Sequence, residues 1–212
     1  MYICFFKINR GYIEMTNYHQ PTFLYAVRNR FYNPGNESED RRWASYVEWS
    51  RLNHVTELIT ADTGLNENLV EIDQDNRDDW NHVVFDGSYQ TGFYTTADFV
   101  LSRIGDHKHF NLLAAVISPD RDCALIYLEN YDFIGYDLLD QYYDTSALTN
   151  CSGFDNTFSP AALNNFGLIS DYEKALDIHQ RLWENNAGEE HADTNIIAIW
   201  RHRIPGHQMA AK

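Results

Sequence analysis

Short apolar runs separated by turn residues mark the second half of the chain. FNLLAAVIS (110–118) is followed by the turn PDRD, CALIYLE (123–129) is followed by the turn NYD, and FIGYDLL (133–139) comes next. Runs of this length bounded by Pro, Asp and Asn predict β-strands joined by tight turns. We therefore expect a three-stranded antiparallel meander over these residues.

Two more segments have strand character. TFLYAVRNRFY (22–32) is rich in aromatic and β-branched residues and predicts a strand, with a helix as the alternative. NIIAIWRHRI (195–204) predicts a strand that we expect to pair with the meander. The stretch 63–82 is polar and irregular, and it predicts a long loop or a joint between subdomains.

Helical periods begin after acids or hydroxyl side chains. Trp43, Tyr46 and Val47 follow a cluster of acids at helical spacing, which predicts a helix over 39–52. YTTADFVLSRI (94–104) opens with Thr hydroxyls ahead of an apolar period and predicts a shorter helix.

The longest predicted helix follows the capping box SDYE (170–173) and extends to about residue 185. Ser159 and Pro160 predict the start of a short helix just before it, closed by Gly167. We expect one broad apolar stripe of the long helix to face the core. The stripe comprises Tyr172, Ala175, Leu176, His179, Leu182 and Trp183.

Strands and helices occur in blocks rather than in strict alternation, which favours an α+β fold over a doubly wound sheet. We expect a single α+β domain over residues 1–212. Its antiparallel sheet would combine the central meander with the C-terminal strand, and its helices would pack on one face. Residues 1–14 are a candidate extension because Met15 is an alternative start, and residues 206–212 are a candidate flexible tail.

Composition narrows the function classes. Apolar residues make up 44% of the chain, enough for a packed core, and 31 acids against 16 Lys and Arg give a net charge of −15. Such a charge repels phosphate backbones, so we expect no nucleic-acid binding through a basic surface. The longest apolar run, LLAAVI (112–117), is too short to span a bilayer. Three separated cysteines without CxxC spacing favour a reducing compartment, so we expect a cytoplasmic protein.

The acidic excess suggests a non-catalytic role first. Our first hypothesis is an acidic binding protein of the inhibitor type, such as an immunity protein or an antitoxin, that masks a basic protein partner; a solvated acidic surface without a partner is the alternative. The expected contact residues belong to an acidic loop and to a segment rich in Tyr and acids. They are Asp73, Asp75, Asp78 and Asp79 in the loop, and Glu129, Tyr131, Asp132, Tyr136, Asp137 and Asp140 in the meander.

A cysteine hydrolase is the second hypothesis. Cys151, then His191, then Asp193 or Asn195 follow the Cys–His–Asp/Asn chain order of papain-like hydrolases. However, no helix begins directly after Cys151 to stabilise a thiolate, so a structural cysteine is the prediction we favour. The chain also has no P-loop, no GxGxxG, no GxSxG and no HExxH.

A metal site is the third hypothesis. His107 and His109 are two residues apart, so in an extended segment both rings face the same side and could bind one divalent ion. A third ligand would have to come from Asp106, His82 or the acids of 73–79. Two ligands do not define a site, and we expect no cofactor.

Overall fold

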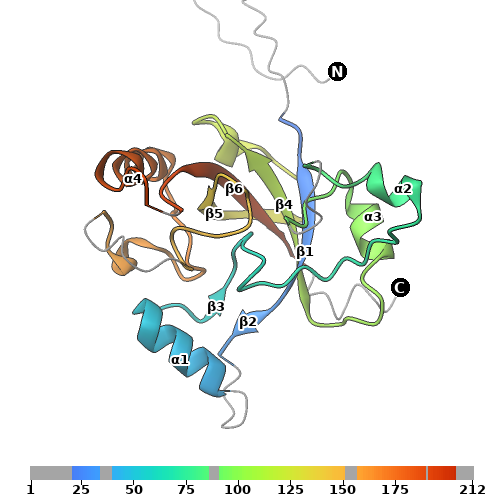
Figure 1. Ribbon diagram of the computed structural model, residues 1–212, viewed down its shortest axis with the longest axis horizontal. Helices are drawn as coiled ribbons and strands as arrows, with labels where there is room; N and C mark the ends of the chain where they lie inside the picture. Colours follow the sequence, from blue (N-terminus) through green and yellow to red (C-terminus); the bar gives the residue numbers. More distant parts are fainter. Residues whose placement is uncertain (1–20, 34–39, 86–90, 151–156, 190, 204–212) are drawn as a thin grey trace, which may run out of the picture.

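The computed structural model describes residues 21–33, 40–85, 91–150, 157–189 and 191–203 (Figure 1). Its centre is a four-stranded antiparallel sheet in the order β1-β4-β6-β5. The strands are β1 (Leu24–Asn29), β4 (Phe110–Ile117), β6 (Thr194–His202) and β5 (Tyr131–Asp140). Together with the helices, this sheet confirms the predicted α+β fold.

The C-terminal strand β6 lies in the middle of the sheet rather than at its edge. It pairs with β4 through Ala114 and Trp200 and with β5 through Tyr136 and Ala198. Apolar residues on both faces of β6 are buried, which explains its nearly continuous apolar sequence.

The predicted meander is wrong in its middle strand. Residues 123–129 form the 3₁₀ helix η1 (Cys123–Leu125) and an irregular segment, and β4 and β5 are separated by β6. Leu125 and Tyr127 of the predicted strand are exposed to solvent. The run is as apolar as a strand, but β6 fills the place beside β4 that this segment would need.

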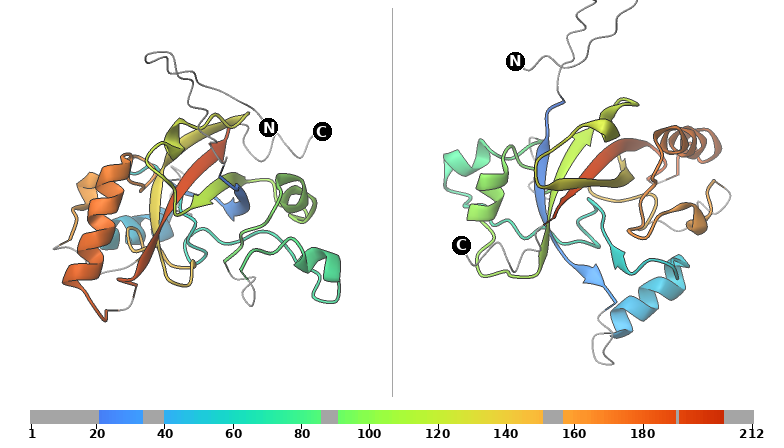
Figure 2. Two further views of the ribbon diagram at one scale, coloured as in Figure 1. Left: turned by 90° about the horizontal axis from the view of Figure 1, so that it is seen from above. Right: turned by 180° about the vertical axis from the view of Figure 1, so that it is seen from behind.

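One face of the sheet is covered by helices. α4 (Tyr172–Asn185) packs against β5 and β6, and α3 (Ala97–Ser102) packs against β1 (Figure 2). Trp200 lies on this face, where its ring meets those of Phe23 and Phe133 at centroid distances of 5.1 and 5.2 Å. Helices α3 and α4 therefore share one apolar core with this side of the sheet, as expected.

The stripe predicted for α4 is rotated by about one residue. Asp171, not Ser170, caps the helix, and its side chain accepts a hydrogen bond from the Lys174 amide at 2.9 Å. The buried positions are Ala175, Ile178 and Leu182, whereas Leu176 and Trp183 are exposed. Spacings of three and four residues fit the observed stripe as well as the predicted one, so periodicity alone did not choose between them.

A small two-stranded sheet supports α1. β2 (Phe31–Tyr32) pairs with β3 (Glu57–Leu58), and α1 (Asp40–Ser50) lies beside them, away from α4 (Figure 1). The ring of Phe31 contacts Trp43 and Tyr46 of α1 at centroid distances of 5.1 and 5.2 Å. This aromatic cluster anchors the helix.

The opposite face of the main sheet is covered by irregular segments. Its apolar residues form a second core cluster with residues of the covering loops. The strands contribute Leu24, Ala26, Leu113, Ala115, Leu139, Ile197 and Ile199, and the loops contribute Ile59, Ala61, Phe93 and Leu168.

Arg28 extends this second face beyond Leu24 and Ala26, because alternate residues of a strand share a face. It is fully buried, and its guanidinium donates to the carbonyls of Thr91 at 2.7 Å and of Ala61 and Gly92 at 3.1 Å. Burial lowers the pKa of Arg28 to about 10. Gly92 has a φ of +59°, and a Cβ there would lie 2.5 Å from the Arg28 Nη1 atom, so only glycine fits.

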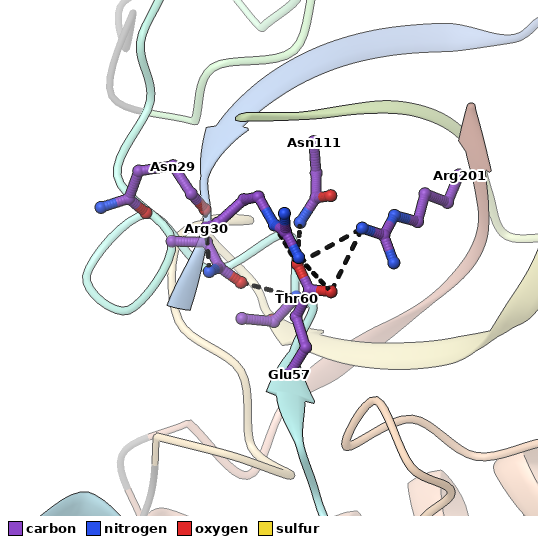
Figure 3. A network of polar contacts seen from close by, with 7 residues as sticks. Asn29, Arg30, Glu57, Thr60, Asn111 and Arg201 are labelled. Atoms are coloured by element: carbon purple, nitrogen blue, oxygen red, sulfur yellow. Dashed lines mark hydrogen bonds and ion pairs between the residues drawn. The ribbon is translucent and has the colours of Figure 1, made fainter. Parts of the chain in front are cut away.

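Glu57 connects the small sheet to the large one through the network in Figure 3. Its carboxylate accepts two hydrogen bonds from Arg30, at 2.7 and 3.0 Å, and others from Asn111 of β4 and Arg201 of β6. Burial opposes ionisation of Glu57, but the hydrogen bonds and charges of the two arginines outweigh it and hold its pKa below the ordinary value.

None of the helices in the described ranges has the length and apolar character needed to cross a bilayer.

Candidate functional site

A pocket of about 660 Å³ opens where the end of β5 meets the loop that follows α4. Its walls come from the turn 141–145, from the last turn of α4, and from residues on either side of position 190. The described lining residues are Asp140, Gln141, Tyr142, Asp144, Thr145, Trp183, Gly188, Glu189, His191, Ala192 and Asp193.

A histidine–carboxylate pair forms part of the pocket lining. His191 Nδ1 lies 2.9 Å from Asp140 Oδ2, and the Asp140 side chain is almost fully buried. The other carboxylate oxygen accepts hydrogen bonds from the amides of Tyr142 and Asp144. An ionised carboxylate only accepts hydrogen bonds, so the Nδ1 atom that faces it is the donor in this contact.

The position of the His191 ring is imposed by its surroundings. Its backbone φ is +63°, a conformation that residues other than glycine adopt only rarely. Asp140 pairs with Thr194 at the start of β6, which brings the end of β5 next to the loop that carries His191. Asn195 strengthens this junction, because its side chain donates to the Asp140 carbonyl and accepts from the Tyr143 hydroxyl, both at 3.2 Å.

The pocket is acidic. Four of its lining residues carry carboxylates, namely Asp140, Asp144, Glu189 and Asp193, and none of its described lining residues is Lys or Arg. Burial and the nearby charge of Asp140 raise the pKa of Asp144 above its ordinary value. A positive group in this space would offset the repulsion between these two carboxylates.

Two aromatic side chains lie open to solvent at the same pocket. Trp183 of α4 is 56% exposed and Tyr142 of the turn is 68% exposed. Seven large apolar side chains of the described part of the chain are exposed, and two of them, Tyr142 and Trp183, line this pocket. Acids and exposed rings together make this the strongest candidate for ligand binding.

Several contact residues predicted from the sequence lie below the surface. Tyr131, Tyr136, Asp137 and Asp140 of β5 are buried, while Glu129 and Asp132 are exposed. Asp137 accepts hydrogen bonds from the hydroxyls of Thr60 and Ser146 and from two backbone amides. Asp137 is fully buried in the interior of the fold, and this burial raises the pKa of its carboxyl group.

The predicted acidic loop contains the short helix α2 (Arg77–Trp80). Asp73, Asp75 and Asp78 are exposed, but Asp79 is buried and paired with Arg103, whose Nε and Nη2 atoms lie 3.1 and 2.7 Å from its oxygens. The hydrogen bonds and charge of Arg103 lower the pKa of Asp79.

Of the residues predicted for a cysteine hydrolase, His191 and Asp193 line the pocket and Asn195 lies behind it, while Cys151 falls outside the described residues. Sequence reasoning missed Asp140 as the partner of His191 and grouped it with surface acids. The two residues are 51 positions apart, and only the pairing of β5 with β6 brings them together.

The predicted metal pair, His107 and His109, lies in an exposed connection before β4. Among the candidate third ligands, His82 stacks on Phe99 at 4.2 Å and contacts the Thr95 hydroxyl. Within the described ranges, no three His, Cys, Asp or Glu side chains are grouped so that they could hold a metal ion. No residue in the described ranges therefore completes a three-ligand site with this pair.

Comparison of the chain with protein-family models, with curated proteins and with solved structures found no match in any of the three.

Proposed function

We propose that this protein binds a basic protein partner, as an inhibitor-type protein does, and that the pocket beside His191 is the centre of the contact. One observation carries the proposal: four carboxylates line one pocket whose described lining residues include no Lys or Arg. A concave site with one sign of charge focuses its field and attracts the opposite charge. The net charge of −15 acts in the same direction at longer range.

The experiment compares two charge-matched double variants. Asp144→Asn with Asp193→Asn removes two of the four pocket carboxylates, and Asp73→Asn with Asp75→Asn removes two carboxylates from the exposed loop before α2. Proteins captured from the source cell are identified, purified and bound again to each variant at low and high salt. Capture of unidentified proteins from a crude lysate does not count as support for the proposal.

We expect a basic partner whose association slows about tenfold with the pocket variant and little with the loop variant, because charges near an interface act mainly on the association rate. High salt should weaken the wild-type complex through screening. Partners that are neutral or acidic, or an equal loss in both variants, would contradict the proposal.

A second candidate function is favoured by the 2.9 Å contact between His191 and the buried carboxylate of Asp140. A carboxylate that orients an imidazole is the usual support of a general base, and Cys151 would be the nucleophile it activates. Cysteine hydrolysis is therefore the alternative to simple binding.

Thiol labelling at neutral pH tests this alternative. Burial raises the pKa of the Cys123 thiol to about 12, so Cys123 serves as an unreactive internal control. A hydrolase predicts fast labelling of Cys151 that is lost in both His191→Ala and Asp140→Asn. Slow labelling, unchanged in the two variants, would remove this candidate.

A further inference from the structure

We infer that the group held in this pocket is an arginine side chain of the partner, with its guanidinium stacked on the exposed rings and paired with the carboxylates. This inference rests on the proposed function and adds the chemistry of the recognised residue. It depends on the coincidence of exposed aromatic side chains with acids in one concave site.

The aromatic side chains come from two separate elements. Trp183 follows Leu182, which is fully buried in the core, so the helix turns the larger apolar ring outward and the smaller side chain inward. Tyr142 follows Asp140 by two residues in the turn after β5. Rings left in water forgo the stabilisation that burial would give, and a ligand that covers them recovers it.

The carboxylates differ in their availability. Asp140 is almost fully buried and is occupied by His191 and by two backbone amides. Glu189 and Asp193 are exposed, and Asp144 is partly exposed with one oxygen accepting from the Thr145 hydroxyl. Asp144, Glu189 and Asp193 can therefore pair with a cation, while Asp140 holds His191 and the turn after β5 in place.

Arginine fits this combination better than lysine. The guanidinium is planar, stacks on aromatic faces and presents parallel N–H groups that pair with a carboxylate through two hydrogen bonds. The lysine ammonium is a compact, strongly hydrated charge without a flat face. Acids alone would attract both residues, so the exposed rings are what should distinguish them.

The test titrates the full-length, isotope-labelled protein with N-acetyl-arginine amide and N-acetyl-lysine amide, followed by nuclear magnetic resonance. We expect the arginine probe to shift the Trp183 indole and the backbone signals of 141–145, and to bind at least about fivefold tighter than the lysine probe. Trp183→Ala should weaken arginine binding by about threefold to thirtyfold, the range of one cation–π contact. Trp183→Phe should retain most of it.

Trp49→Ala is the matched control, since Trp49 on α1 is 47% exposed but does not line the pocket. It should leave arginine binding unchanged. Equal affinity for both probes, shifts located elsewhere, or equal losses in the Trp49 and Trp183 variants would overturn the inference. If the arginine probe fails while the pocket charge variant still loses the basic partner, the proposed function stands and only the arginine assignment falls.

Discussion

On one face of the four-stranded sheet, Trp200 and Tyr136 pack against other rings, and one of these rings, Tyr172, belongs to α4. On the other face, Arg28 and Asp137 meet the backbone of irregular segments, although both side chains are as deeply buried as Trp200. The same sheet is therefore covered in two different ways.

The difference follows from what each covering element leaves unpaired. A helix satisfies most of its own backbone hydrogen bonds, so it can offer the sheet a purely apolar face. An irregular segment brings free N–H and C=O groups into the interior, and each needs a partner there. Arg28 supplies donors to the carbonyls of Ala61, Thr91 and Gly92, and Asp137 accepts from the Ala61 amide. We conclude that buried polar side chains on the second face satisfy the backbone groups of its irregular cover, whereas the helices of the first face satisfy their own.

The largest effect should come from breaking the apolar face. Trp200→Ala removes a side chain that contacts Phe23 and Phe133 and leaves a cavity in the helix-covered core. We expect a loss of about 3–5 kcal/mol in the free energy of unfolding, measured by urea denaturation. A loss under about 1 kcal/mol would mean that this core is not closely packed.

Breaking the polar face should cost slightly less. Arg28→Met keeps most of the volume but removes the donors to three buried carbonyls. We expect a loss of about 3 kcal/mol, since each buried polar group left unsatisfied costs about 1–3 kcal/mol and the apolar side chain recovers part of it. If the methionine variant is as stable as the wild type, the guanidinium is not needed to satisfy these carbonyls.

The junction between the two sheets should show a smaller effect with a definite pH dependence. Glu57→Gln weakens the contacts to Arg30 and Arg201 and should cost about 1.5–3 kcal/mol at pH 7. The pKa of Glu57 is lower in the folded than in the unfolded chain, so ionised Glu57 adds stability above the unfolded value and loses it as the pH falls through the folded one. The two proteins should therefore converge in stability in acid. A difference that stays constant from pH 7 to pH 3 would contradict this origin.

The smallest effect should come from Trp183→Ala, which the sequence alone would have placed among the largest. Trp183 is 56% exposed on α4, so we expect a loss under about 1 kcal/mol. Thermal unfolding of the Trp183→Ala and Trp200→Ala variants, measured under the same conditions, compares a surface tryptophan with a core tryptophan. Similar losses of stability in both variants would mean that Trp183 is buried, as the stripe predicted from the sequence requires.

The sequence predicted most of the helices and strands whose own residues show an apolar pattern or a capping residue. β1, β4, β5, β6, α1, α3 and α4 each overlap a segment predicted from its apolar pattern, and α4 begins at Tyr172, two residues after the predicted cap Ser170. The strand prediction for residues 123–129 was wrong because an apolar run does not show whether the edge of a neighbouring strand is free to pair with it. Most of the expected contact residues of β5 are buried for a related reason: alternation assigns faces to a strand but does not show that both faces will be covered.

The candidate site was the least accessible to sequence reasoning. His191 was singled out from the sequence and lines the pocket, but its partner Asp140 depends on strand pairing across about fifty residues. Trp183 was assigned to the core because a helical period fixes the spacing of a stripe more firmly than its rotation. These two features define the pocket, and both required the three-dimensional arrangement.

The central position of β6 has a consequence for how the chain folds. β6 is the last strand in the described part of the sequence, yet it pairs with both β4 and β5. During synthesis, β1 and β4 can pair early, but among the described strands β5 pairs only with β6, so its ladder forms after residues 194–202 have left the ribosome. Until then, the edges of β4 and β5 that β6 later covers remain unpaired in the nascent chain. Unpaired strand edges are sites for aggregation and for chaperone binding. We expect the sheet to close only after translation of β6, with a folding rate limited by these long-range pairings.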